Sequence, residues 1–241
     1  MLIKTKAVVL RTVKYGERQL IVDLLTEQAG RVSCIVSMPK TAAGKNRKQL
    51  YQPLTILDIE YDDRQQGQLH RIREVRIATP YSSIPFDAYK LPIALFLAEF
   101  LHYATRDEQQ NAPLFAFVSS SLAWLDAAER PVPNFHLVFI MRLAHYIGFY
   151  PNLDDYHDGC VFDLRNAVFT SQPPLHSDYV GAEEASHLQQ LMRMQYATMH
   201  LFRLSRSQRN RILDLLLTYY RLHVPAFPEL HSTAIVQELF V

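Results

Sequence analysis

Cysteine is scarce in this sequence of 241 residues, which contains two, Cys34 and Cys160. Two cysteines exclude a disulfide-rich scaffold and suggest a reducing, cytoplasmic setting. Long apolar runs are missing too, since none approaches the roughly 18–20 residues that a membrane-spanning helix needs. The first residues include two lysines but no apolar run long enough for the core of a signal peptide.

Familiar catalytic motifs are also absent. The metalloprotease pattern HExxH does not occur, and the serines at 119–121 lie in a helical pattern rather than in a GxSxG turn. Gly44-Lys45 is not a phosphate-binding loop, because no glycine lies five positions earlier and Asn46 follows. We therefore expect a protein that binds rather than an enzyme.

The charged residues that are present are unevenly distributed. The 25 Lys and Arg and 24 Asp and Glu give a net charge of +1. Residues 1–80, however, contain 14 basic and 8 acidic side chains, a balance of +6, which leaves −5 for residues 81–241. A basic segment joined to an acidic one indicates contact with a polyanion, with an ordinary solvated surface as the alternative. Because 49% of the residues are hydrophobic, the chain has enough apolar side chains for a sizeable core.

The first 80 residues have the β-branched pattern of strands. We expect five strands, over residues 7–13, 19–26, 31–37, 54–61 and 68–79, with glycine-containing turns between several of them. The last strand departs from strict alternation near Arg73-Glu74, which predicts a β-bulge. Five short strands in about 80 residues suit a small closed barrel, because closure removes the exposed edges.

After residue 80 the hydrophobic period changes from two to 3.6. We expect helices over 87–106, 111–125, 134–147, 183–202 and 206–223, with Asn111 and Asn134 as N-caps and Gly148 as a helix end. Residues 150–182 are rich in Pro and Gly and are expected to be irregular. The predicted fold class is therefore α+β and multi-domain. A barrel domain (1–80) precedes a helical domain (81–241), which includes an irregular region at about 150–182.

Basic side chains of the barrel region are candidate contacts for phosphate groups. The loop over 40–48 has four cations and no acid, and further cations lie on the first and last strands. Tyr15 and Tyr51 are candidates to stack on bases, although for each of them a place in the core or at a turn is the favoured interpretation. The predicted DNA-binding residues are Arg11, Lys14, Arg18, Lys40, Lys45, Arg47, Lys48, Arg71, Arg73 and Arg76.

Potential metal ligands are densest at residues 154–160. This segment contains Asp154, Asp155, His157, Asp158 and Cys160, and His176 follows downstream. A structural zinc site needs four nitrogen or sulfur ligands, usually in closely spaced pairs, and nothing here resembles a second pair. An Asp-rich turn is the favoured interpretation, and whether His157, Cys160 and His176 bind a metal stays open.

Three arginines, Arg206, Arg209 and Arg211, open the last long helix. Cations at a helix N-terminus oppose the helix dipole, so an anionic partner would account for them. A solvated helix end is the alternative.

Several motifs resemble the bacterial RecO family of recombination mediator and DNA repair proteins. Residues 7–36 resemble its N-terminal pattern of an apolar strand, Arg, a Tyr-Gly-Glu turn, a second strand and Thr-Glu-x-x-Gly-Arg. Further similarity lies in the basic loop with Gln49-Leu50-Tyr51-Gln52-Pro53-Leu54, in residues 94–103, in LAHYIGFYP at 143–151 and in residues 219–224. The match spans most of the chain.

The resemblance implies an oligonucleotide-binding (OB) barrel, a helical domain and a cytoplasmic, nucleoid-associated protein. It also implies binding of single- and double-stranded DNA, strand annealing, and recombinase loading with RecR and the single-stranded DNA-binding protein SSB. The tail of SSB is acidic and ends in hydrophobic residues, and the candidates to bind it are Arg142, Arg203, Arg206 and Arg209.

Many family members have four zinc-binding cysteines, where this chain has Tyr156, Gly159 or Cys160, and residues 173–176. We therefore expect no zinc and no other cofactor. Two alternatives of other classes stay open. One is an adaptor whose barrel binds an acidic protein, and the other is a metal-dependent hydrolase or nuclease built on Asp154, Asp155, His157 and Asp158.

Overall fold

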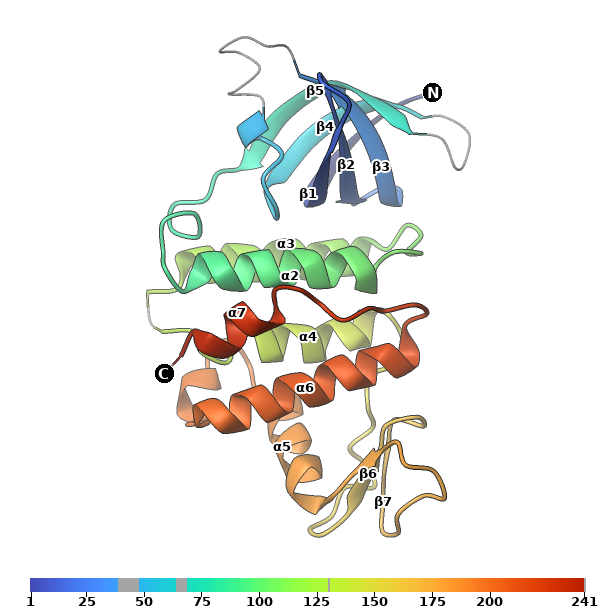
Figure 1. Ribbon diagram of the computed structural model, residues 1–241, viewed down its shortest axis with the longest axis vertical. Helices are drawn as coiled ribbons and strands as arrows, with labels where there is room; N and C mark the ends of the chain where they lie inside the picture. Colours follow the sequence, from blue (N-terminus) through green and yellow to red (C-terminus); the bar gives the residue numbers. More distant parts are fainter. Residues whose placement is uncertain (39–47, 64–68, 130, 241) are drawn as a thin grey trace. The chain divides into compact units, whose positions relative to one another are not determined.

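The computed structural model describes residues 1–38, 48–63, 69–129 and 131–240. The chain divides into two compact units, Met1–Ala127 and Ala128–Val241. Strands give way to helices after Thr79, as the hydrophobic period predicts. The first unit extends beyond this point and also contains two helices, so the barrel shares its unit with them (Figure 1).

Five strands of the first unit close into a barrel in the order β1-β2-β3-β5-β4 (Figure 1). They are β1 (Leu2–Tyr15), β2 (Gln19–Thr26), β3 (Gly30–Ser37), β4 (Ile56–Asp62) and β5 (His70–Thr79). Neighbours are antiparallel except β3 and β5, whose short parallel pairing completes the ring. The predicted five-stranded barrel is thus confirmed, with a first strand longer than expected.

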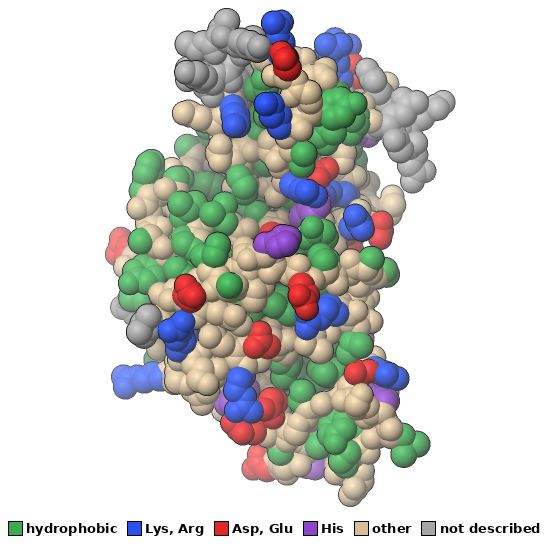
Figure 2. Space-filling view, in the orientation of Figure 1, with side chains coloured by type: hydrophobic (Ala, Val, Ile, Leu, Met, Phe, Trp, Pro, Cys, Tyr) green, Lys and Arg blue, Asp and Glu red, His purple; other side chains and the backbone are tan. Residues whose placement is uncertain are grey.

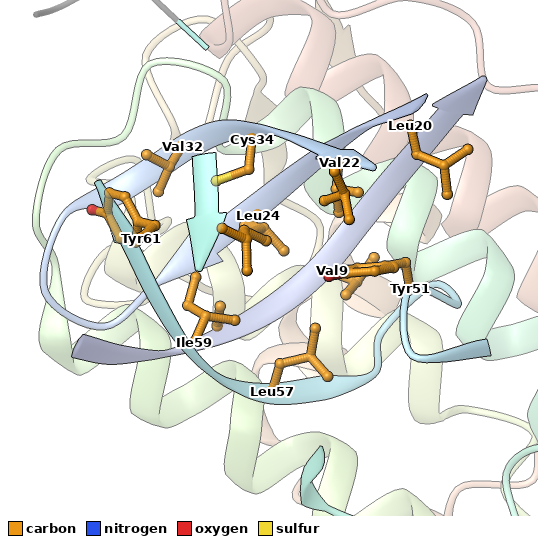
Figure 3. Packing of buried hydrophobic residues seen from close by; sticks show 13 residues of the cluster. Val9, Leu20, Val22, Leu24, Val32, Cys34, Tyr51, Leu57, Ile59 and Tyr61 are labelled. Atoms are coloured by element: carbon orange, nitrogen blue, oxygen red, sulfur yellow. The ribbon is translucent and has the colours of Figure 1, made fainter. Parts of the chain in front are cut away.

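Alternate strand residues point inward and form the barrel core (Figure 3). Val9, Leu24, Cys34 and Leu57 are almost completely buried there, as the period of two requires. Tyr51 also packs into this core and is only 1% exposed. The favoured interpretation of Tyr51 as a core residue is therefore confirmed, and its buried ring is not available to stack on bases.

Irregularities in the ladder change which side chains face outward. Between β4 and β5, Glu60 pairs with Glu74 but Tyr61 pairs with Ile72, so Arg73 is the extra residue of the predicted bulge. In β1 the register shifts between Val9 and Arg11. An extra residue in a strand reverses the side on which the following side chains lie.

Helices α2 (Lys90–Ala104) and α3 (Ala112–Ala127) complete the first unit. Helix α2 packs on β1, whose Val8 and Leu10 are buried outside the barrel core. Asn111 caps α3 as predicted, since its Oδ1 accepts the backbone N–H of Leu114 at 3.0 Å. Helix α2 begins later than expected, because Asp87 Oδ1 accepts the N–H groups of Tyr89 and Lys90 and forms a turn there.

A close backbone contact joins the barrel to the segment between α2 and α3. Gly30 has φ +66°, and a Cβ at this position would lie 2.2 Å from the carbonyl oxygen of Gln109. The next residue, Arg31, donates its N–H to the carbonyl oxygen of Glu108 at 2.9 Å. Only glycine fits this approach without displacing the backbone.

The second unit is mainly helical. It contains α4 (Phe135–Tyr146), α5 (Ala182–Arg193), the 3₁₀ turn η1 (Met199–Leu201), α6 (Arg206–His223) and α7 (Thr233–Glu238). The region expected to be irregular includes a small antiparallel sheet, ordered β7 (Val168–Thr170), β6 (Val161–Asp163) and β8 (Tyr179–Val180). The helix expected over 183–202 ends at Arg193. Within the described ranges, no helix has both the length and the apolar character needed to cross a membrane.

Gly148 ends α4 as predicted, with φ +92° and its N–H bonded to the carbonyl of Ala144. Asn134 precedes α4, but its side chain makes no capping bond. Instead its Nδ2 donates to the carbonyls of Met199 and Phe202, at 3.2 and 2.9 Å. The predicted side-chain cap is wrong, because this buried amide joins two distant segments.

Candidate nucleic-acid interface

The outer side of β1, β2 and β3 presents side chains in three rows. These side chains alternate with the core residues of β2 and β3, and strand pairing sets each row across the sheet. Tyr15 is 53% exposed and Val13 39% exposed, so apolar groups are accessible here. We call this set the outer face: Arg11, Asp23 and Ser33; Val13, Ile21 and Ile35; Tyr15, Gln19 and Ser37.

Exposed cations border the outer face. Lys14 and Arg18 flank the β1–β2 turn, and Arg71 of β5 lies beside Ile35 through the parallel pairing. Among the described residues, none of these three cations has a carboxylate partner. Figure 2 shows basic and apolar side chains near one another on the visible face of the barrel. The outer face thus combines unpaired positive charge with an aromatic and aliphatic surface.

A hollow at the barrel rim lies where the basic loop begins. Gly16, with φ +62°, forms the β1–β2 turn, and the N–H of Met38 donates to the carbonyl of Arg18 at 2.7 Å. The chain therefore leaves β3 beside Arg18. The hollow is lined by Tyr15, Gly16, Glu17, Arg18, Gln19, Ser37 and Met38. Of the loop's cations, Lys48 is exposed, whereas Lys40, Lys45 and Arg47 lie outside the described residues.

Arg73 and Arg76 lie on a different part of the barrel, where charges are balanced. Arg73 contacts Asp62 Oδ2 at 2.7 Å, and Arg76 contacts Asp58 Oδ2 at 3.0 Å. The hydrogen bond to Asp62, followed by its negative charge, raises the pKa of Arg73. Both arginines are exposed, so these pairs are individually weak. A role for Arg73 and Arg76 in DNA binding stays a prediction.

The sequence did not predict a polar network at one end of the outer face. Arg31 lies 2.6 Å from His102 Nδ1 and 3.5 Å from Asp23 Oδ2, and Arg11 lies 3.4 Å from His102 Nε2. Ser33 donates to the other oxygen of Asp23 at 2.5 Å. Burial, followed by the charge of Arg31, lowers the pKa of His102 to about 4, so the ring is neutral at pH 7. The network holds the first row of the outer face, Arg11, Asp23 and Ser33, in place.

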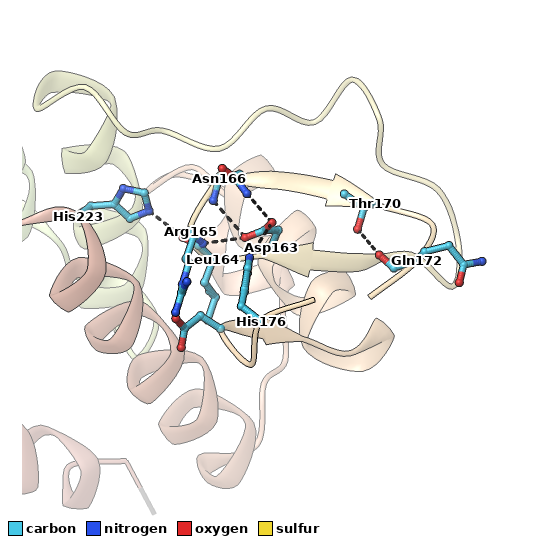
Figure 4. A network of polar contacts seen from close by, with 9 residues as sticks. Asp163, Leu164, Arg165, Asn166, Thr170, Gln172, His176 and His223 are labelled. Atoms are coloured by element: carbon cyan, nitrogen blue, oxygen red, sulfur yellow. Dashed lines mark hydrogen bonds and ion pairs between the residues drawn. The ribbon is translucent and has the colours of Figure 1, made fainter. Parts of the chain in front are cut away.

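In the small sheet, a carboxylate occupies the centre of a polar network (Figure 4). Asp163 is 4% exposed and accepts from the N–H groups of Arg165 and Asn166, at 2.9 and 3.1 Å, and from Asn166 Nδ2 at 2.7 Å. His176 Nε2 lies 3.4 Å from the same carboxylate. These contacts hold the β6–β7 turn and the segment before β8.

The possible metal ligands do not converge. Cys160 is completely buried, and His157 Nε2 lies 2.9 Å from Ser171 Oγ. Asp154 accepts from its neighbour Asn152, as in an ordinary turn. No cluster of three or more His, Cys, Asp or Glu side chains suited to a metal occurs among the residues that the structure describes.

The arginines predicted to bind a partner peptide lie in the second unit. Arg142 donates to the carbonyl of Met194 at 3.2 Å and lies over the ring of Tyr196, and Arg203 is exposed. Arg206 and Arg209, in the first turns of α6, donate to carbonyls near the C-terminus.

A five-stranded barrel in this strand order defines an OB-type protein, a class whose sheet face and neighbouring loops bind oligonucleotides or oligosaccharides. The family model "Recombination protein O N terminal" matches residues 1–81, and "Recombination protein O C terminal" matches residues 85–233. The chain belongs to the RecO family of DNA repair proteins.

Relatives named "DNA repair protein RecO" match along their whole length. The protein from Bacteroides fragilis is 48% identical over 241 residues, and that from Phocaeicola vulgatus is 47% identical over 240. The protein from Porphyromonas gingivalis is 34% identical over 246 aligned positions. Each alignment covers 100% of both chains.

Proposed function

We propose that this protein binds single- and double-stranded DNA through its barrel and anneals complementary strands. With RecR and SSB as partners, it promotes recombinase loading in DNA repair. The outer face carries this proposal, because Tyr15 and Val13 are exposed beside cations that have no carboxylate partner among the described residues. Membership of the RecO family supports it. Because the proposed substrate is chromosomal DNA, the proposed location of the protein is the bacterial cytoplasm, at the nucleoid.

The mechanism is electrostatic. Arg11, Lys14, Arg18 and Arg71 bind phosphates and release counterions, which requires no particular base sequence. Tyr15 offers a ring on which a base can stack. Because the phosphates rather than the Watson–Crick edges are held, the bases stay available to pair with a second strand.

In the second unit, Arg142, Arg203, Arg206 and Arg209 are proposed to bind the acidic tail of SSB. Guanidinium groups suit carboxylates because each can donate two parallel hydrogen bonds to a carboxylate. The proposed chemistry is binding alone, without catalysis and without zinc. If the protein cleaved DNA when incubated with Mg²⁺ or Mn²⁺, that result would instead support the nuclease alternative.

The experiment that tests DNA binding is a salt titration with labelled single-stranded oligonucleotides. Replacing Arg18 and Arg71 with Ala should weaken binding and reduce the slope of log K against log salt by about 0.7 for each phosphate that is no longer neutralised. The matched control replaces Arg165 and Arg211, which form ion pairs in the second unit, and removes the same charge. Equal slope changes in both variants would remove the outer face from the DNA site.

A further inference from the structure

The C-terminal segment of the chain lies against the first turns of α6. We call residues 233–240 the C-terminal strap; they comprise α7, Leu239 and Phe240. Arg206 Nε donates to the carbonyl of Gln237 at 2.9 Å, and Arg209 Nη2 donates to the carbonyl of Phe240 at 2.8 Å. The guanidinium of Arg209 also lies over the Phe240 ring, 5.5 Å from its centroid. The two arginines thus bind the strap through backbone acceptors and one aromatic ring.

These arginines are not needed to cap α6. Ser205 and Gln208 form a complete capping box, with bonds of 3.2 and 2.8 Å. Cations at this end oppose the dipole of α6, whereas they complement the final carbonyls of α7. Burial and the nearby charge of Arg206 lower the pKa of Arg209, which indicates two like charges held together. Arg209 also donates to the carbonyl of Leu204 at 2.6 Å, which holds the segment before α6. The bond of Arg206 to Gln237 and the second bond of Arg209, to Phe240, are made to the strap.

The strap is attached by few buried groups. Val236 is 3% exposed, but Ile235 is 53% exposed and Glu238 is exposed as well. Side-chain bonds from Gln237 to Asp214 at 2.9 Å and from Asn210 to the carbonyl of Gln237 at 3.3 Å add two polar contacts. Segments with little buried apolar surface and exposed hydrogen bonds open at low free-energy cost.

The strap shares its chemistry with the SSB tail proposed to bind here, which is acidic and ends in hydrophobic residues. Glu238-Leu239-Phe240 places an acidic residue before apolar residues that include an aromatic ring. The surface formed by Arg206 and Arg209 recognises carbonyl acceptors and the aromatic face, which an acidic, aromatic-ended peptide also provides.

We propose that the strap is a built-in competitor that occupies the Arg206–Arg209 surface and must detach before an acidic, aromatic-ended peptide of a partner protein binds there. This inference rests on the proposed peptide-binding role of the two arginines. It adds a level of control, because any change that loosens the strap strengthens partner binding without altering the binding surface.

The test measures binding of a synthetic probe, a nine-residue peptide of Asp and Gly residues ending in Phe, by fluorescence anisotropy. A chain that ends at Ser232 should bind the probe about tenfold more tightly than the full chain if the strap is closed nine-tenths of the time. Phe240→Ala in the full chain should give a smaller gain in the same direction. Ile235→Ala is the matched control within the strap and should leave the affinity unchanged.

Equal affinities of the full chain, the shortened chain and Phe240→Ala would overturn the competitor role and leave the binding surface standing. Failure of all three to bind would refute the peptide-binding function itself. If the shortened chain does not fold, hydrogen exchange measured on the full chain tests whether the strap detaches. Adding the probe should speed exchange at residues 233–240, and unchanged exchange with bound probe would overturn the proposal.

Discussion

At the scale of single residues, the first unit buries charge where the barrel meets α2. The Arg31 and Asp23 side chains are 11% and 15% exposed and lie 3.5 Å apart. Burial is the main cause that lowers the pKa of Arg31, because removing the guanidinium from water disfavours its charged form. Removing the carboxylate would leave that guanidinium without its counter-charge.

Asp23→Asn should therefore lower the free energy of unfolding by about 3 kcal/mol, because a buried cation loses its partner. Urea unfolding at pH 7 measures the loss. Asp58→Asn is the matched control, since it breaks the exposed pair with Arg76 and should cost less than about 1 kcal/mol. Similar losses in the two variants would show that Asp23 does not stabilise Arg31.

A second residue joins two parts of the first unit. Asp126, at the end of α3, accepts from the N–H groups of Ser82, Ser83 and Ile84 at 2.8 to 2.9 Å. Burial acts to raise the pKa of Asp126, but these hydrogen bonds together lower it to about 2.

Because the folded pKa of Asp126 is depressed, its stabilisation is present above the unfolded value near 4 and is lost as the pH falls towards 2. After allowance for solvent screening, the contribution is about 1 kcal/mol. Urea midpoints at pH 7 and pH 3 should differ less in Asp126→Asn than in the unaltered chain. An identical pH dependence in both would contradict this role.

At the scale of elements, the small sheet of the second unit is held by Asp163 and its hydrogen bonds. Burial opposes ionisation, but bonds from Asn166 and Arg165 together with His176 lower the pKa of Asp163. Four hydrogen-bonded or charged contacts around one carboxylate cross-link the β6–β7 turn and the segment before β8.

Metal analysis of the purified protein should therefore find zinc far below one ion per chain. Prolonged dialysis against EDTA should leave the thermal unfolding midpoint unchanged, whereas Asp163→Ala should lower it by several degrees. One tightly held zinc per chain, with a midpoint that falls after dialysis, would show that the loop region depends on metal.

The elements differ in how far sequence predicts them. The strands, the Arg73 bulge and the Asn111 cap depend on residues that are close along the chain, so local periodicity and turn chemistry identify them. The bond from Asn134 to Met199 joins residues 65 positions apart, and the Arg31–His102 contact spans 71. Such contacts depend on how elements pack, which periodicity does not encode.

The same limit applies to the site. The sequence identified the cations of the barrel. It did not show that Arg73 and Arg76 have carboxylate partners from β4, whereas Arg71 has none among the described residues. The pairing becomes visible only when the strand register is known.

At the scale of the whole molecule, the basic barrel does not stand apart from its neighbouring helices. Val8 and Leu10 are buried outside the barrel core, where α2 packs on β1. Arg31 loses a backbone partner if residues 108 and 109 are removed.

We expect a fragment of residues 1–80 to aggregate, because it exposes these apolar side chains, and a fragment of residues 1–127 to fold. Circular dichroism with thermal unfolding checks both. A cooperative transition in the shorter fragment would show that the barrel is independent of α2 and α3.

The contact at Gly30 has a consequence for ancestry. Since the carbonyl of Gln109 fills the space that a Cβ would need, the barrel is shaped to fit the segment that connects α2 to α3. A gene fusion that moved the five strands alone into another protein would separate the barrel from the segment at residues 108 and 109 that packs against Gly30. We therefore expect the barrel to be inherited together with α2 and α3, so that genomes encode these parts in one protein.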